Sequence, residues 1–181
     1  MNKDYFKKSE KDDYDKFLDF QELTHIFKGI ERMKKGHHSD ATGYTVNSMG
    51  EIRKFNIELK DRVLYLLDDG NISGCSSNGP YIDDTLVIES HKVADLLLDN
   101  MIGFEPLYVN FTLDGSTIIF NLNKLTRRPL KRYYKTIYSK GYERMEDGHR
   151  QHLYMIDAAV YDKEGNLIKK PGEEWKTQQN S

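Results

Sequence analysis

The chain has 181 residues, 38% of them hydrophobic, and a formal net charge of −2 at pH 7. This length suits one compact domain, and the single cysteine, Cys75, excludes an intramolecular disulfide. No apolar run approaches the roughly 18 residues of a membrane-spanning helix. The charged segment 1–16 is unlike a signal peptide, so we expect a cytoplasmic protein without membrane contact.

The first predicted element is an amphipathic helix that follows residues 1–13, which are either a charged tail or the frayed start of a helix. From Tyr14 to Lys35, apolar residues recur every three or four positions, which is the period of a helix with one buried face. Gly36 is a typical residue to end such a helix.

A hairpin comes next, with strands at 41–47 and 51–60 on either side of the turn 48–50. Segment 61–67 is short and apolar and fits either a strand or a helix, whereas the glycine-rich segment 68–84 has the composition of a loop. The remaining predicted elements are a strand at 85–89, a helix at 90–101 with Ser90 as its N-cap, a hairpin of 106–113 and 116–122 around Asp-Gly, a helix at 129–140 with Pro129 in its first turn, and a second hairpin within 152–170. The sum is an α/β (α+β) fold in a single domain at 14–170, followed by a disordered tail at 171–181.

Three charged residues meet if the first hairpin has a three-residue turn. Asp40 then lies opposite Glu58, with Cβ atoms about 4.5–5.5 Å apart. Lys60 follows Glu58 by two positions and lies on the same face of the strand. A two-residue turn shifts the register and gives Asp40 a different neighbour. The alternative is that Asp40 caps a loop and that Glu58 and Lys60 belong to a solvated strand face.

Two carboxylates this close repel each other unless a cation compensates them. Mg²⁺ or Mn²⁺ would supply this charge, because both take oxygen ligands. A bound metal ion also lowers the pKa of a water ligand and polarises a phosphoryl oxygen, while Lys60 would orient the water or neutralise developing charge. An acid on the preceding helix, Glu22 or Glu31, is the candidate for a third ligand.

A helix followed by "SDATGYTVNSMGEIRKFNIELK" (39–60) resembles the core of the PD-(D/E)XK nuclease superfamily, in particular its small phage-type and bacterial members. Asp40 matches the family aspartate and Glu58-Leu59-Lys60 matches the (D/E)XK triplet, although Ser39 stands where the family often has proline. The likeness covers roughly residues 14–125. It implies a restriction-endonuclease-like core of helix, three-stranded meander, helix and strand, to which this chain adds a C-terminal β-hairpin. It also implies an Mg²⁺-dependent endonuclease, often a homodimer.

A basic surface for nucleic acid is expected downstream, because residues 115–142 contain neither aspartate nor glutamate. Tyrosines that can stack on bases, such as Tyr134, are interleaved with the basic residues. The alternative is the solvated side of an amphipathic helix. His37 and His38, beside Asp40, are further candidates for phosphate contact or proton relay. The candidate backbone-binding residues are Lys92, Lys124, Arg127, Arg128, Lys131, Arg132, Lys135 and Lys140.

The function predicted from the sequence is therefore a metal-dependent nuclease that cleaves phosphodiester bonds of DNA or RNA through an Mg²⁺-activated water. The alternative is a non-catalytic module that binds nucleic acid or a nucleoprotein on the same fold, for example as a mobile-element inhibitor of host defence. A response to Mg²⁺ or Mn²⁺ distinguishes them, because a ligand of the native state stabilises it.

Overall fold

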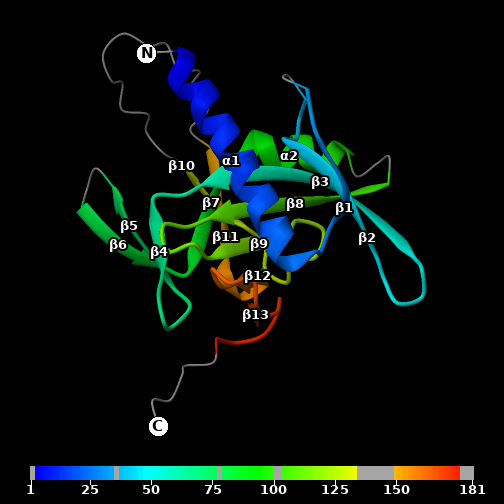
Figure 1. Ribbon diagram of the computed structural model, residues 1–181. Helices are drawn as coiled ribbons and strands as arrows, with labels where there is room; N and C mark the ends of the chain where they lie inside the picture. The colour runs from blue at the N-terminus through cyan, green and yellow to red at the C-terminus, as the bar shows by residue number, and fades with distance from the viewer. Residues whose placement is uncertain (1–2, 35–36, 77–78, 100–102, 134–148, 176–181) are drawn as a thin grey trace.

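The computed structural model describes residues 3–34, 37–76, 79–99, 103–133 and 149–175, and it has the mixed α+β architecture that the sequence predicts (Figure 1). Two α-helices and three sheets make up this part of the chain. Neither described helix combines the length and the hydrophobicity that a membrane-spanning segment requires.

The main sheet has seven strands, and its centre is a parallel pair. β3 and β8 run parallel, and the other neighbouring strands are antiparallel. A parallel pair needs a long crossover connection, and here the crossover contains the helix α2 (Ser90–Asp99). The strand order is β1 (Lys28–Arg32), β2 (Ala41–Val46), β3 (Ile52–Asp61), β8 (Phe104–Phe111), β9 (Thr117–Asn121), β12 (Ala158–Tyr161) and β13 (Leu167–Lys169).

Two three-stranded sheets complete the fold. One has the order β10 (Leu130–Tyr133), β11 (His149–Tyr154) and β7 (Thr85–Glu89), and the other has the order β4 (Leu64–Leu66), β5 (Ile72–Ser76) and β6 (Gly79–Asp83). β7 leads directly into α2, so the first of these sheets fixes where α2 begins.

One face of the main sheet packs against the helix α1 (Lys3–Thr24), which crosses it in Figure 1. Successive residues of a strand point to opposite faces. Phe55, Ile57 and Leu59 of β3 therefore share one core cluster with Phe17 and Phe20 of α1. The even-numbered residues of β3, which include Glu58, point to the other face.

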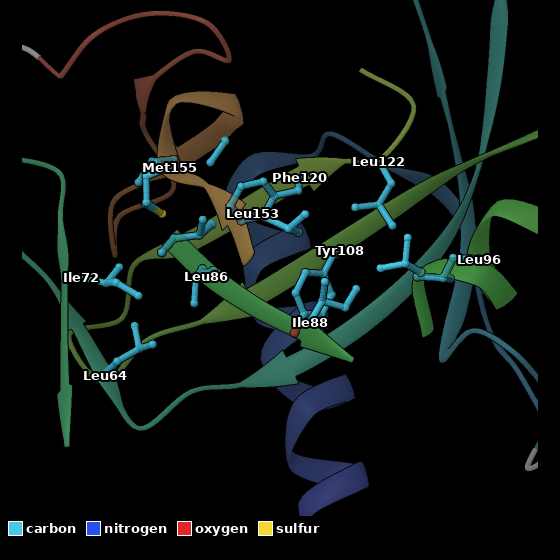
Figure 2. Close-up of a cluster of buried hydrophobic side chains, with 14 residues drawn as sticks. Leu64, Ile72, Leu86, Ile88, Leu96, Tyr108, Phe120, Leu122, Leu153 and Met155 are labelled. Carbon is cyan, nitrogen blue, oxygen red and sulfur yellow. The ribbon is translucent and has the colours of Figure 1, made fainter. Parts of the chain in front are cut away.

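The other face packs against α2 and the sheet that contains β7. Tyr108 of β8 lies here in a second cluster with Leu86 and Ile88 of β7 and Leu96 of α2 (Figure 2). The two helices thus cover opposite faces of the main sheet, and Glu58 lies on the side of α2.

The register of the first hairpin agrees with the three-residue turn. Thr42 lies opposite Asn56 and Tyr44 opposite Lys54. The Asn47 N–H donates to the Glu51 carbonyl at 3.1 Å and closes the loop. The hairpin 106–122 and a C-terminal hairpin of β12 and β13 are also present.

The prediction of a helix up to Lys35 was wrong, because α1 ends at Thr24 and β1 follows. The Gln21 side chain holds the backbone of Phe27 through two hydrogen bonds of 2.6 and 2.8 Å. Gly29 adopts φ 56° at a bulge of β1, where a Cβ atom would lie 2.4 Å from the ring of Tyr44. Of the periodic apolar residues after Thr24, Ile30 thus belongs to β1, while Phe27 and Met33 flank this strand. Gly36 lies outside the described residues.

Other expected boundaries also changed. Residues 3–13 form the first turns of α1 rather than a tail, and the predicted loop 68–84 contains β5 and β6. Segment 61–67 supplies β4 in a separate sheet, so β1 is the first strand of the meander. The predicted helix 129–140 starts instead as β10, and residues 134–140 lie outside the described part.

The predicted N-cap at Ser90 is not observed. α2 begins at this residue, but its hydroxyl is buried and, among the described residues, has no hydrogen-bond partner.

The packing of α1 predicts a large difference between adjacent positions. Phe17 is fully buried, whereas Leu18 is 38% exposed. We expect Phe17→Ala to lower the free energy of unfolding by about 3–5 kcal/mol through lost burial and a cavity. Leu18→Ala should cost less than about 1 kcal/mol, and urea denaturation measures both. Similar losses in the two variants would contradict this packing.

Candidate active site

The first hairpin brings Asp40 next to the Glu58–Lys60 triplet. The Asp40 N–H donates to the Ile57 carbonyl at 2.9 Å, and the Leu59 N–H donates to Asp40 Oδ2 at 2.8 Å. The Asp40 carboxylate is therefore tied to the triplet's own backbone, and its position depends on the register of β2 and β3.

Glu58 is a buried carboxylate with one paired oxygen and one unpaired oxygen. Its side chain is 8% exposed, and Lys92 Nζ of α2 lies 2.7 Å from Oε1. Oε2 is buried and has no hydrogen-bond partner among the described residues. An unpaired buried acceptor is costly to maintain, which marks this position as a candidate ligand site.

Burial, and next the negative charge of Asp40, raise the pKa of Glu58 to about 7. The positive charges of Lys92 and Lys60 act in the opposite direction but are outweighed. Burial disfavours the charged form of Lys92, yet the neighbouring Glu58 raises the pKa of Lys92 above its ordinary value. Perturbed carboxyls of this kind are frequent at functional sites.

Lys60 lies exposed two positions beyond Glu58 and opposite Asn110 of β8. Its charge acts on Glu58 and also on Asp13 of α1, whose carboxyls have raised pKa values. Asp40, Glu58 and Lys60 thus influence one another at one end of β3.

Asp13 of α1 is an acid on which the charges of Lys60 and Asp40 act, and the sequence analysis missed it. Burial, and next the charge of Asp61, raise the pKa of Asp13 to about 6, and Lys60 and Asp40 also act on it. Asp13 Oδ1 is buried and lacks a hydrogen-bond partner in the described part of the chain. Its spacing of four residues before buried Phe17 places an acid on the core-facing stripe, and this was the available signal.

The predicted helix acids, Glu22 and Glu31, do not occupy this position. Glu22 is exposed near the C-terminal end of α1. Glu31 is not on a helix at all; it is exposed on β1, opposite Thr42. The early end of α1 explains the error, because it moves Glu31 into the sheet.

A half-buried arginine, Arg62, connects the sheet under the site to β7. The guanidinium of Arg62 donates to Asn110 Oδ1 at 3.0 Å and also to the Tyr108 hydroxyl and the Val87 carbonyl. Tyr108 itself donates to the Val87 carbonyl at 3.1 Å. Because β7 continues into α2, these contacts position the start of the helix that carries Lys92.

The two histidines lie beside the site. His38 Nδ1 is 3.7 Å from Asp95 Oδ2 of α2, and His37 Nδ1 is 3.1 Å from the Ser39 hydroxyl. His38 thus connects the segment before Asp40 to α2, and His37 makes a contact within that segment. No contact of these two histidines with the Glu58 carboxylate is observed.

The predicted basic surface is only partly described. Lys124 lies 4.0 Å from Glu105, and the Arg127 guanidinium stacks over Tyr154 with 5.3 Å to the ring centroid. Arg128 and Lys131 are exposed, and Arg132 belongs to β10. Tyr134, Lys135 and Lys140 lie outside the described residues.

The register of the second sheet brings the end of β10 toward the site. Arg132 is opposite Arg150, and Arg150 is opposite Glu89, the last residue before α2. These three residues therefore form one cross-strand row that leads from the basic strand β10 to the start of α2.

The donor set fits a hard divalent cation that keeps part of its water. Within the described residues, no group of three His, Cys, Asp or Glu side chains is arranged to hold a metal ion alone. Mg²⁺ is usually held by one or two carboxylates together with water and substrate phosphates. Asp40 and Glu58 are the two carboxylates that such a site would use, and Glu58 Oε2 has no hydrogen-bond partner among the described residues.

Comparisons of the chain with models of known families, with curated proteins and with solved structures found no match.

The raised pKa of Glu58 predicts a pH-dependent stability. The folded state holds a proton on Glu58 that the unfolded state releases, so this contribution is complete below about pH 4.5 and is lost as the pH rises through about 7. We expect the free energy of unfolding of Glu58→Gln, relative to wild type, to increase over this range by on the order of 3 kcal/mol.

Urea denaturation at several pH values measures this difference. The exposed Glu164→Gln is the control, and its difference from wild type should stay nearly constant. An identical pH dependence in Glu58→Gln and wild type would contradict a buried, protonated Glu58.

Proposed function

We propose that the chain is a divalent-metal-dependent nuclease of the PD-(D/E)XK type. The order of its elements supports this, because α1, the meander β1–β2–β3, α2 and β8 follow the helix, meander, helix and strand that the resemblance implies. The two hydrogen bonds that join Asp40 to Ile57 and Leu59 support it as well, because they hold Asp40 beside the triplet.

The observation that carries the proposal is the unpaired Oε2 of Glu58. A buried carboxylate oxygen without a partner is unfavourable, and a second carboxylate beside it adds repulsion. A folded protein tolerates this arrangement where it serves a ligand. A divalent cation removes both costs at once, since it coordinates oxygen and cancels negative charge.

Each charged residue then has a defined task. Asp40 and Glu58 would hold the cation, and Asp13 would act through water or a neighbouring ligand. The cation, when bound, supplies an acidic water and polarises a phosphoryl oxygen. Lys60, exposed at the edge of the pair, would orient the attacking water and stabilise charge on the phosphate. The basic strand β10 would contact the substrate backbone.

One observation favours the non-catalytic alternative. The Lys92 ammonium already gives Glu58 a positive partner at 2.7 Å. A protein that keeps this ion pair permanently would have the nuclease fold without needing a metal ion, and would act by binding nucleic acid or a nucleoprotein. The response to metal separates the two functions.

The nuclease proposal predicts that cleavage depends on three side chains. Asp40→Asn keeps an oxygen acceptor for the Leu59 N–H but removes the charge. Glu58→Gln and Lys60→Met likewise remove the charge of their side chains and keep a similar size. We expect each to reduce Mg²⁺-dependent cleavage of a labelled DNA and RNA panel by at least about 100-fold, because each removes a charge from the reacting centre.

Lys54→Met is the matched control, because Lys54 is exposed on the same strand and lies beside Phe104. Full cleavage by Asp40→Asn or Glu58→Gln would refute the assignment. Absence of cleavage by the wild type with every substrate, together with metal-independent binding, would favour the alternative.

The basic surface predicts salt-dependent binding. If four to six phosphates are neutralised, the logarithm of the duplex binding constant should fall against the logarithm of salt concentration with a slope of about −4 to −5. Lys131→Ala should reduce that slope by about 1, whereas Lys163→Ala, in the turn between β12 and β13, should not change it. Fluorescence anisotropy measures this, and salt-independent binding would rule out a phosphate-contacting surface.

A further inference from the structure

The accessible side of Glu58 is already occupied. Lys92 Nζ lies 2.7 Å from Oε1, while Oε2 has no access to solvent and no partner in the described residues. An ion that arrives from solvent therefore meets the ammonium before it meets a free carboxylate oxygen. Like charges at such a distance repel strongly in a partly buried setting.

We propose that the Lys92 ammonium occupies the position of the metal ion at Glu58 in the free protein. A substrate phosphate displaces the ammonium from Glu58, so that metal and nucleic acid bind cooperatively. This inference rests on the proposed nuclease function and names the residue that couples its two ligands.

The surroundings of Lys92 allow its side chain to move without moving the helix. Val93 and Leu96 anchor α2 in the core, at 7% and 0% exposure. The Lys92 side chain is 32% exposed and has a flexible four-carbon stem. Release of Glu58 therefore requires a rotamer change and no shift of the backbone.

Lys92 has other anionic partners within electrostatic range. Asp40 and Glu89 both favour its charged form, and the Glu89 side chain is 55% exposed. A phosphodiester at the mouth of the site would be a further partner, because an ammonium and a phosphate oxygen form a charge-assisted hydrogen bond. The Lys92 ammonium can thus exchange a carboxylate partner for a phosphate partner while it remains charged.

Cooperativity follows from this exchange. A phosphate that pairs with Lys92 uncovers Glu58, and a cation on Glu58 pushes the ammonium toward the phosphate. The coupling is reciprocal, so substrate must tighten metal binding by the same factor by which metal tightens substrate binding.

Calorimetric titration of Mg²⁺ at pH 8 tests the competition directly. Lys92→Met removes the ammonium, and we expect it to bind Mg²⁺ on the order of tenfold more tightly than the wild type. Lys92→Gln, which keeps a polar partner for Glu58, should show the same gain if Lys92→Met folds poorly. Lys163→Met is the charge-matched control and should equal the wild type, whereas Glu58→Gln should lose binding.

A second titration includes a short oligonucleotide with hydrolysis-resistant linkages. It should raise the Mg²⁺ affinity of the wild type by a similar factor and should have little effect on Lys92→Met.

The outcomes separate the two proposals. Tighter binding by Lys92→Met, or binding by this variant alone, supports the exchange. Equal or weaker binding by Lys92→Met and Lys92→Gln, with Glu58→Gln still inactive in binding, overturns the exchange and leaves the metal site intact. Absence of Mg²⁺ binding in the wild type and in every variant overturns both.

Discussion

The ion pair between Glu58 of β3 and Lys92 of α2 joins the two layers that form the candidate site. Moving a carboxylate from water into a protein interior carries a large desolvation cost, and one ammonium at 2.7 Å offsets part of it. The pKa of Glu58 still rises to about 7, because burial and the charge of Asp40 outweigh that help. The rest of the local structure positions these groups: the hairpin sets Asp40, and the contacts of Arg62 with Tyr108 and Val87 set the start of α2.

The proposed exchange would give the site two chemical states. In the free protein, the pair of acids and the ammonium neutralise one another in part, and one oxygen of Glu58 has no hydrogen-bond partner in the described part of the chain. With a divalent cation and a phosphate, every charge has an opposite neighbour. Under this proposal, a nuclease and a binding module would differ in whether Lys92 leaves Glu58, and the fold alone does not decide between the two functions.

The sequence predicted the parts of the site that depend on local rules. The three-residue turn was sufficient for the register of β2 and β3 from Ala41 to Val46, and the sequence pattern at 85–99 was sufficient for β7 and α2. Asp40 precedes the paired residues of β2, and its N–H donates to the Ile57 carbonyl. The prediction failed where tertiary contacts override local pattern. β1 follows the helical period, yet Gln21 and the bulge at Gly29 make it a strand, and this error led to Glu31 in place of Asp13. The pairing of Lys92 with Glu58 joins residues 34 positions apart, and no local pattern encodes it. The catalytic function itself remains a prediction.

The most direct measurement of the central claim is a crystal structure of the protein with Mn²⁺ and a hydrolysis-resistant oligonucleotide, with the ion located by anomalous scattering. The account predicts one ion between the carboxylates of Asp40 and Glu58, with the Lys92 ammonium withdrawn from Glu58 Oε1. An anomalous map without a peak at these carboxylates, in a crystal where Lys92 still contacts Glu58, would contradict it.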